Sequence, residues 1–144
     1  MQSRNDLRKL NYMMSEMGGL YHKAAVKAGV SDSVHSILYV LCAENYRCFQ
    51  SEIYKQAGIS RQTINSAIRH LEKDGIIYLE KGNGRNTIVC LSEEGIKFAK
   101  EKIEPLYQIE NEIFDEWDSK DIETYLNLTA KYRDALKMKL KNLV

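Results

Sequence analysis

The chain has 144 residues, of which 44% are hydrophobic and 28% are charged, and its formal net charge is +1. This length and composition suit one compact domain, or one domain with helical extensions at its ends, and they argue against a fibrous or a membrane protein. The longest apolar run, 37–43, is far shorter than the roughly 20 residues that cross a bilayer, and the N-terminus lacks the apolar core of a secretory signal. We therefore expect a cytoplasmic protein that does not enter a membrane.

Helical spacing of apolar residues begins near the N-terminus. Segment 5–28 carries an apolar stripe, and Gly29 follows it as a typical helix stop. The stripe consists of Leu7, Leu10, Met14, Met17, Tyr21 and Ala24. Ser31 suits the N-cap of a second helix, 32–44, whose broad apolar face is typical of a central helix. A short link, 45–49, then leads to a third helix, 50–56, closed by Gly58.

The fourth predicted helix, 61–73, has two contrasting faces. Ser60 can cap it and Gly75 stops it. Its narrow apolar stripe comprises Ile64, Ala67, Ile68 and Leu71. The other face carries Arg61, Gln62, Thr63, Asn65, Ser66, Arg69 and His70. A solvated helix ordinarily intersperses acids with its cations, but this face has no acid before Glu72, so it is hydrogen-bonding and cationic.

Two β-branched runs, 76–81 and 87–91, flank the sequence Gly-Asn-Gly-Arg-Asn and predict a β-hairpin. The glycines do not fit a phosphate loop. A dinucleotide fingerprint needs a third glycine where Thr87 stands and a helix after it, and a P-loop needs Gly-Lys-Ser/Thr at the start of a helix. The pattern therefore favours a hairpin over a nucleotide-binding loop.

The remaining residues form two further predicted helices. Ser92 caps a long helix with a kink at Pro105, and Asp118 caps the last one. Their apolar stripes run through Ile96, Ala99, Ile103, Leu106, Ile109, Ile113 and Trp117, and then through Ile122, Leu126, Thr129, Tyr132, Leu136, Leu140 and Leu143. These rows exceed what one small core needs, so we expect a symmetric partner to bury them. Packing on their own domain is the alternative.

The three cysteines, Cys42, Cys48 and Cys90, form no CxxC pair and no zinc-like spacing with the histidines. In a cytoplasmic protein they indicate reduced thiols packed as small hydrophobic side chains, with a redox-sensing thiol as the alternative. No paired carboxylates, nucleophile–base set or metal cluster emerges. The sequence therefore predicts no enzyme, no catalytic residues, no cofactor and no metal.

Two short helices, a tight turn at 57–60 and a polar-faced helix form a helix-turn-helix, and the hairpin makes it a winged helix. Short polar side chains near a helix N-terminus can reach base edges in the DNA major groove, while cations meet phosphates. The run 49–95 contains HLEKDGII, then a glycine-and-arginine wing, then LSEEG. It resembles the MarR family of winged-helix transcriptional regulators, and the flanking helices extend the resemblance over nearly the whole chain.

The resemblance implies a mainly α fold with a small β-hairpin wing. Residues 31–95 would be the winged helix-turn-helix that binds double-stranded DNA, and residues 1–30 and 96–144 would form the dimerisation helices. The homodimer would act on a palindromic operator as a ligand-responsive repressor. The residues expected to contact DNA are Ser60, Arg61, Gln62, Thr63, Asn65, Ser66, Arg69 and Lys73 of the recognition helix and Asn83 and Arg85 of the wing. Asn83 stands where the family usually has an acid.

Many family members release DNA when a small, often aromatic, effector binds between the dimer helices and the winged helix, and others sense oxidants through cysteine. Candidates for lining such a cleft are Tyr21, His22, His35 and Tyr39, although ordinary packing also explains them. A different function class is also open. A winged helix can serve as a protein-interaction module, in which the α-helical face of Arg61, Asn65 and Arg69 would bind an acidic protein.

Replacing Arg85 by alanine is expected to weaken DNA binding by roughly 1–3 kcal/mol, because the wing arginine would enter the minor groove. Titration of the protein against operator DNA at physiological salt measures this loss. An unchanged affinity would remove Arg85 from the DNA interface.

Overall fold

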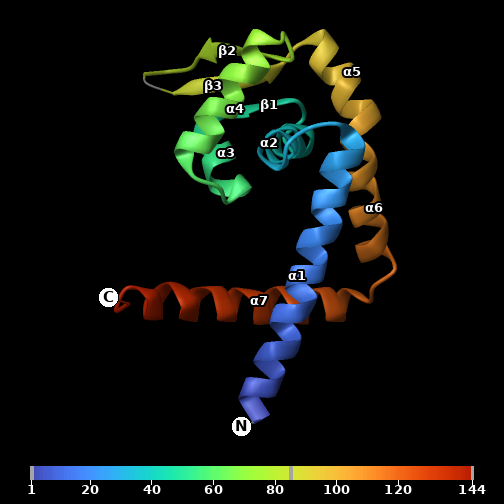
Figure 1. Ribbon diagram of the computed structural model, residues 1–144, viewed down its shortest axis with the longest axis vertical. Helices are drawn as coiled ribbons and strands as arrows, with labels where there is room; N and C mark the ends of the chain where they lie inside the picture. The colour runs from blue at the N-terminus through green and yellow to red at the C-terminus, as the bar shows by residue number, and fades with distance from the viewer. Residues whose placement is uncertain (1, 85, 144) are drawn as a thin grey trace. The chain divides into compact units, whose positions relative to one another are not determined.

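The computed structural model describes residues 2–84 and 86–143, so the predicted wing contact Arg85 lies outside the described residues. The described residues form helices and one small antiparallel sheet, which confirms the mainly α winged-helix fold (Figure 1). The chain divides into two compact units, Met1–Tyr107 and Gln108–Val144. None of the helices within the described ranges is long and apolar enough to span a bilayer.

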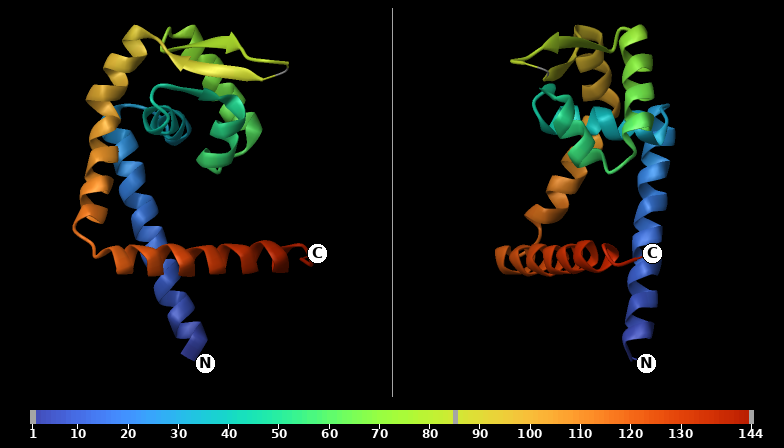
Figure 2. Two further views of the ribbon diagram at one scale, coloured as in Figure 1. Left: turned by 180° about the vertical axis from the view of Figure 1, so that it is seen from behind. Right: turned by 90° about the vertical axis from the view of Figure 1, so that its left-hand side faces the viewer.

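The first unit is built around the central helix α2. Its helices are α1 (Gln2–Ala28), α2 (Asp32–Ala43), α3 (Gln50–Ala57), α4 (Arg61–Lys73), α5 (Glu93–Lys102) and the start of α6 (Glu104–Asp115). Ile37, Leu38 and Leu41 of α2 are completely buried, and they join residues of α3, α4, α5 and the sheet in one core. Only the C-terminal end of α1 enters this core, and the rest of α1 extends away from it (Figure 2).

The serine and aspartate caps predicted from the sequence are confirmed. Backbone N–H groups donate to the Oγ of Ser31, Ser60 and Ser92 at 3.0–3.2 Å, and Lys120 N donates to Asp118 Oδ1 at 3.2 Å. Each bond satisfies one of the N–H groups that the first turn of a helix leaves without a partner. Gly58 ends α3 with φ of +65°, a left-handed conformation that glycine adopts without steric cost and that redirects the chain into α4.

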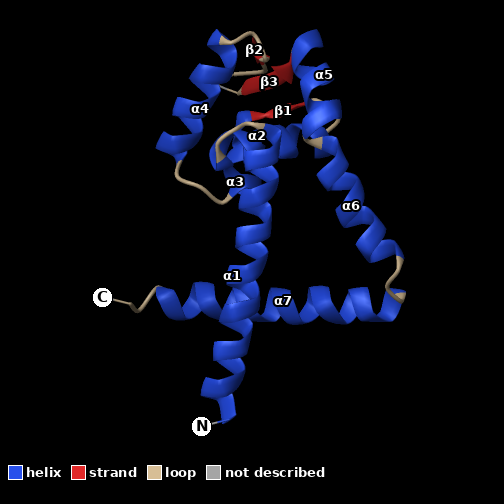
Figure 3. Ribbon diagram, turned by 45° about the vertical axis from the view of Figure 1, so that its right-hand side comes forward, coloured by secondary structure: helices blue, strands red, loops and turns tan. Residues whose placement is uncertain are grey.

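The sheet has three strands in the order β1-β3-β2 (Figure 3). β2 (Ile77–Lys81) and β3 (Thr87–Leu91) form the predicted hairpin, and Gly82 N donates to Asn86 O at 2.7 Å where the turn begins. The strands of this hairpin extend beyond the neighbouring helices (Figure 2).

The prediction of a plain link at 45–49 was wrong, because β1 (Arg47–Phe49) pairs with β3 there. Asn45 and Tyr46 take φ values of 64° and 76°, which turn the chain sharply after α2. Leu91 N donates to Tyr46 O at 2.9 Å and aligns the two segments. A strand of three residues carries too little alternation for a pattern in the sequence, and its pairing with β3 determines it.

The start of α5 lies directly on the backbone that begins the hairpin. Ser92 N donates to Ile76 O at 2.9 Å, and Ser92 Oγ donates to Gly75 O at 2.6 Å. Gly95 is buried, and a Cβ atom at this position would lie 2.0 Å from Ile76 O. Only glycine allows this approach between helix and strand.

The long helix predicted from residue 93 onward is divided into α5 and α6 at Ile103, two residues before the predicted kink at Pro105. Pro105 thus occupies the first turn of α6, where its missing N–H costs no hydrogen bond. In the second unit, α6 leads to α7 (Ser119–Leu140). Phe114, Trp117 and Tyr125 form two edge-to-face ring contacts there, with centroids 5.3 and 5.6 Å apart.

Replacing Gly95 by alanine is expected to lower the free energy of unfolding by about 3 kcal/mol, because the added methyl group meets a backbone carbonyl that cannot move away alone. Urea denaturation followed by circular dichroism measures the loss. The matched control is Gly18→Ala in α1, where nothing lies within 4 Å of the added atom and helix propensity rises by up to about 1 kcal/mol. Equal effects of the two substitutions would contradict the close approach at Gly95.

Candidate nucleic-acid interface

Helix α4 separates a buried apolar face from an exposed polar one. Ile64, Ala67, Ile68 and Leu71 are buried, as their spacing predicts. The predicted DNA contacts that are exposed are Ser60, Arg61, Gln62, Thr63, Ser66, Arg69 and Lys73 on or beside α4 and Asn83 in the turn of the hairpin. Among the predicted DNA contacts that the structure describes, only Asn65 is half-buried.

The N-terminus of α4 favours an anionic partner. Its first turn holds no acid, and the aligned peptide dipoles leave a partial positive charge at this end. The hydroxyls of Ser60 and Thr63 lie 2.8 Å apart, and Ser60 Oγ also accepts from Thr63 N. Ser60 therefore shapes the start of the helix in addition to lying at its exposed end.

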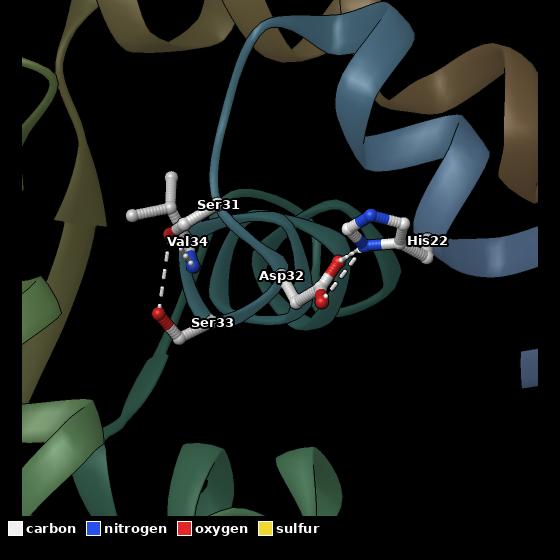
Figure 4. Close-up of polar contacts among 5 residues, drawn as sticks. All are labelled: His22, Ser31, Asp32, Ser33 and Val34. Atoms are coloured by element: carbon white, nitrogen blue, oxygen red, sulfur yellow. Dashed lines mark hydrogen bonds and ion pairs between the residues drawn. The ribbon is translucent and has the colours of Figure 1, made fainter. Parts of the chain in front are cut away.

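A groove of about 550 Å³ connects α4 with the start of α2. It is lined by Ser31, Ser33, Val34, Gln62, Thr63, Ser66, Ala67, His70 and Asp74. Figure 4 shows the α2 side, where the hydroxyls of Ser31 and Ser33 lie 3.2 Å apart and Val34 N donates to Ser31 Oγ. Short hydroxyl and amide groups from two helices thus share one open surface, which suits hydrogen bonding to phosphates and base edges.

Two residues of α3 that the sequence did not single out contact the polar face of α4. Gln50 Nε2 donates to Tyr54 Oη at 2.7 Å and to Asn65 Oδ1 at 3.1 Å, and Tyr54 Oη donates to Asn65 Oδ1. The guanidinium carbon of Arg61 lies 4.8 Å from the centre of the Tyr54 ring. These contacts join residues of separate helices, so no local pattern in the sequence could have indicated them.

The sheet places one further cation next to an acid. Arg47 Nη2 lies 3.0 Å from Glu80 Oε2, so this pair joins β1 to β2 across the middle strand. Both side chains are well exposed, and such a pair contributes little to stability. Glu80 partly neutralises the charge of Arg47. The exposed Lys and Arg side chains of α4 are Arg61, Arg69 and Lys73.

The four candidate ligand residues have different surroundings. His22 Nδ1 lies 2.9 and 3.0 Å from the two carboxylate oxygens of Asp32, which joins α1 to α2 (Figure 4). The Tyr39 ring packs edge-to-face on Tyr107 with centroids 5.8 Å apart. His35 is 7% exposed, and Tyr21 is largely exposed. Pairing and packing therefore account for His22 and Tyr39, as the alternative interpretation of the sequence allows.

The cysteines do not have the environment of reactive thiolates. Burial, and then the Glu104 carboxylate, raise the pKa of the Cys42 thiol to about 11. Burial, and then neighbouring carboxylates, raise the pKa of Cys48 to about 11 as well. Burial also raises the pKa of Cys90, and the opposing effect of Arg47 is smaller. At neutral pH all three are thiols, whereas redox-sensing cysteines have a lowered pKa.

Among the residues that the structure describes, no group of three His, Cys, Asp or Glu side chains could hold a metal ion.

Comparisons with known proteins agree with this geometry. The model of the MarR family matches residues 28–85. The uncharacterized HTH-type transcriptional regulator YwhA of Bacillus subtilis (strain 168) is 30% identical over 86 residues, which cover 58% of this chain. The match spans 62% of YwhA, less than two thirds of its length.

Solved structures match over a longer part of the chain. NMB1585, a MarR family regulator from Neisseria meningitidis, has a TM-score of 0.79 at 19% identity, and the match covers 95% of this chain and 98% of that one. The S. aureus MepR–DNA complex has a TM-score of 0.65 at 18% identity, covering 90% and 96%. These structures share the fold, and the family model matches the segment from α2 into the hairpin turn. Residues 28–85 are therefore similar to the MarR family, and the chain has the winged helix-turn-helix fold of these solved structures.

Proposed function

We propose that this protein is a sequence-specific regulator of transcription that binds double-stranded DNA as a homodimer, with α4 as the recognition helix. The observation that carries the proposal is the polarity of α4. Its apolar face is fixed in the core against α2, while its exposed face combines amide and hydroxyl groups with Arg61 and Arg69 and has no acid in its first turn. Such a face fits the major groove.

The comparisons support the same partner. MepR has this fold in a complex with DNA, and YwhA is described as a transcriptional regulator. We propose a palindromic operator whose half-sites lie about one helical turn (~34 Å) apart, with residues 31–95 of each protomer on one half-site. The proposed regulator is a cytoplasmic repressor.

Release of DNA by a small aromatic effector is a further part of the proposal. The residues proposed to contact the effector are Tyr21, His22, His35 and Tyr39, on α1 and α2. The His22–Asp32 pair joins these two helices, and α2 supports the buried face of α4. An effector that separated this pair would therefore act on the helix that positions α4.

The proposed dimer is supported by apolar side chains that the single chain leaves exposed. In α1 they include Leu7, Met13, Met14, Met17, Leu20 and Tyr21, and in α7 they include Tyr125, Leu126, Leu128, Tyr132, Leu136 and Leu140. Rows of this size on a soluble protein mark an interaction surface. We propose residues 1–30 and 96–144 as the region in which a second copy covers them.

The test begins with selection of duplexes from a random-sequence library by the full-length protein, followed by titration at two salt concentrations with competitor DNA present. A DNA-binding regulator enriches one symmetric sequence and binds it in the presence of competitor. Absence of binding even at low salt would favour the alternative, a module whose Arg61–Arg69 face binds an acidic protein.

Lys73→Ala is expected to weaken binding to every duplex by a similar factor and to reduce the slope of log affinity against log salt by about 1 per protomer, because a phosphate contact carries no sequence information. Titrations of the selected duplex and of an unrelated duplex over a salt series measure both effects. The matched control is Lys131→Ala on α7, which should leave the slope unchanged. A changed sequence preference in Lys73→Ala would refute a pure phosphate contact.

Leu136→Lys on α7 is expected to shift the protein from dimer toward monomer, because it places a charge on the apolar stripe of this helix. Met138→Lys is the matched control, since Met138 is 70% exposed and lies on the opposite side of α7 from that stripe. Sedimentation velocity measures the two distributions. Dimers that persist in Leu136→Lys would place the interface elsewhere.

A further inference from the structure

The half-buried Asn65 differs from the other predicted DNA contacts because its side-chain oxygen is already bonded within the protein. Gln50 Nε2 and Tyr54 Oη both donate to Asn65 Oδ1, and Gln50 Nε2 also donates to Tyr54 Oη. The three side chains therefore form a closed hydrogen-bonded triangle between α3 and α4.

Each of the three hydrogen bonds in the triangle comes from a different N–H or O–H group. The Gln50 amide supplies two N–H donors, and the Tyr54 hydroxyl supplies one donor and accepts one bond. The Asn65 carbonyl oxygen has two lone pairs and accepts the two remaining bonds. The Gln50 and Tyr54 donors of the triangle each have an acceptor, and the carbonyl end of the Asn65 amide faces α3.

We infer that Gln50 and Tyr54 are positioning residues that make Asn65 a hydrogen-bond donor, and not an acceptor, toward DNA; this rests on the proposed function of α4. With Oδ1 occupied, only the Nδ2 amino group remains to meet a base. Its partners are acceptors at the major-groove edge, which are guanine N7 and O6, adenine N7 and thymine O4. The triangle excludes the usual bidentate pairing of asparagine with adenine, which needs the carbonyl oxygen for the adenine amino group.

Tyr54 also positions the neighbouring cation. The Arg61 guanidinium lies over the Tyr54 ring at 4.8 Å, and stacking of this kind leaves the N–H groups at the guanidinium edge available to phosphate or base acceptors. One tyrosine thus acts through its hydroxyl on Asn65 and through its ring on Arg61. Tyr54→Phe removes the first action and retains the second, whereas Tyr54→Leu removes both.

The triangle itself is tested without DNA. Urea unfolding of Tyr54→Phe, Asn65→Ala and the double variant forms a thermodynamic cycle. We expect the unfolding equilibrium constant of the double variant to differ at least about threefold from the product of the single effects, since either substitution alone already opens the triangle. Tyr12→Phe on α1, where the side chain is 67% exposed, is the matched control for loss of a hydroxyl. Additive effects of Tyr54→Phe and Asn65→Ala would overturn the triangle.

The donor role is tested with the duplex selected by the wild-type protein. Each adenine is replaced in turn by purine, which lacks the amino group, and affinities of wild type and Asn65→Ala are compared. We expect Asn65→Ala to bind the natural duplex roughly tenfold more weakly and to lose the same factor as wild type at every purine replacement. A replacement that weakens wild type but not Asn65→Ala would overturn the inference, because Asn65 would then contact an adenine amino group.

The positioning role predicts an effect on specificity. Tyr54→Phe should lower the ratio of affinities for the selected and unrelated duplexes roughly fivefold, with the salt slope unchanged, and Tyr54→Leu should lower it further. Equal weakening on both duplexes would indicate a merely structural tyrosine and overturn the role. If the wild-type protein selects no sequence, the proposed function is wrong. The unfolding cycle still tests the triangle in that case.

Discussion

The carbonyl of Ile76 is the point on which the arrangement of the winged helix depends. It accepts from Ser92 N, lies within 3.1 Å of Ser92 Oγ, and leaves no room for a side chain at Gly95. Helix α4 ends just before this residue, the hairpin begins at it, and α5 starts against it. One carbonyl therefore joins the base of the hairpin to the start of α5 through backbone atoms, which are less able to adjust than side chains.

The polar face of α4 is organised from its other end by α3. The buried face of α4 fixes where the helix lies, but it leaves the polar side chains free to rotate. Tyr54 and Gln50 restrict two of them, the half-buried Asn65 by hydrogen bonds and the exposed Arg61 by stacking. Restricting side chains before binding reduces the conformational entropy lost on association. In the proposed complex, α3 therefore contributes to DNA recognition through the side chains it holds on α4.

The sequence was sufficient for features that depend on neighbouring residues. Apolar spacing predicted the helices, and Ser31, Ser60, Ser92 and Asp118 were identified as caps because a cap needs only its own first turn. It was insufficient where pairing between distant segments decides the structure. Strand β1 exists because β3 lies beside it, and the Asn65 triangle joins residues 11 and 15 positions apart. Most predicted DNA contacts were correctly expected on an exposed face, but which atoms of Asn65 remain available depends on α3.

The charge distribution gives hydrogen bonding a large share in the proposed recognition. Segment 61–91 has five Lys or Arg and three acids, and one of those acids, Glu80, pairs with Arg47. Nonspecific binding depends mainly on the number of phosphates that cations neutralise, so a surface with few cations binds random DNA weakly. The affinity for an operator must then come from base contacts, which require side chains held in fixed orientations. The Gln50–Tyr54–Asn65 triangle and the stacking of Arg61 supply that orientation, and for this reason the weak net charge of the chain is compatible with a selective DNA-binding protein.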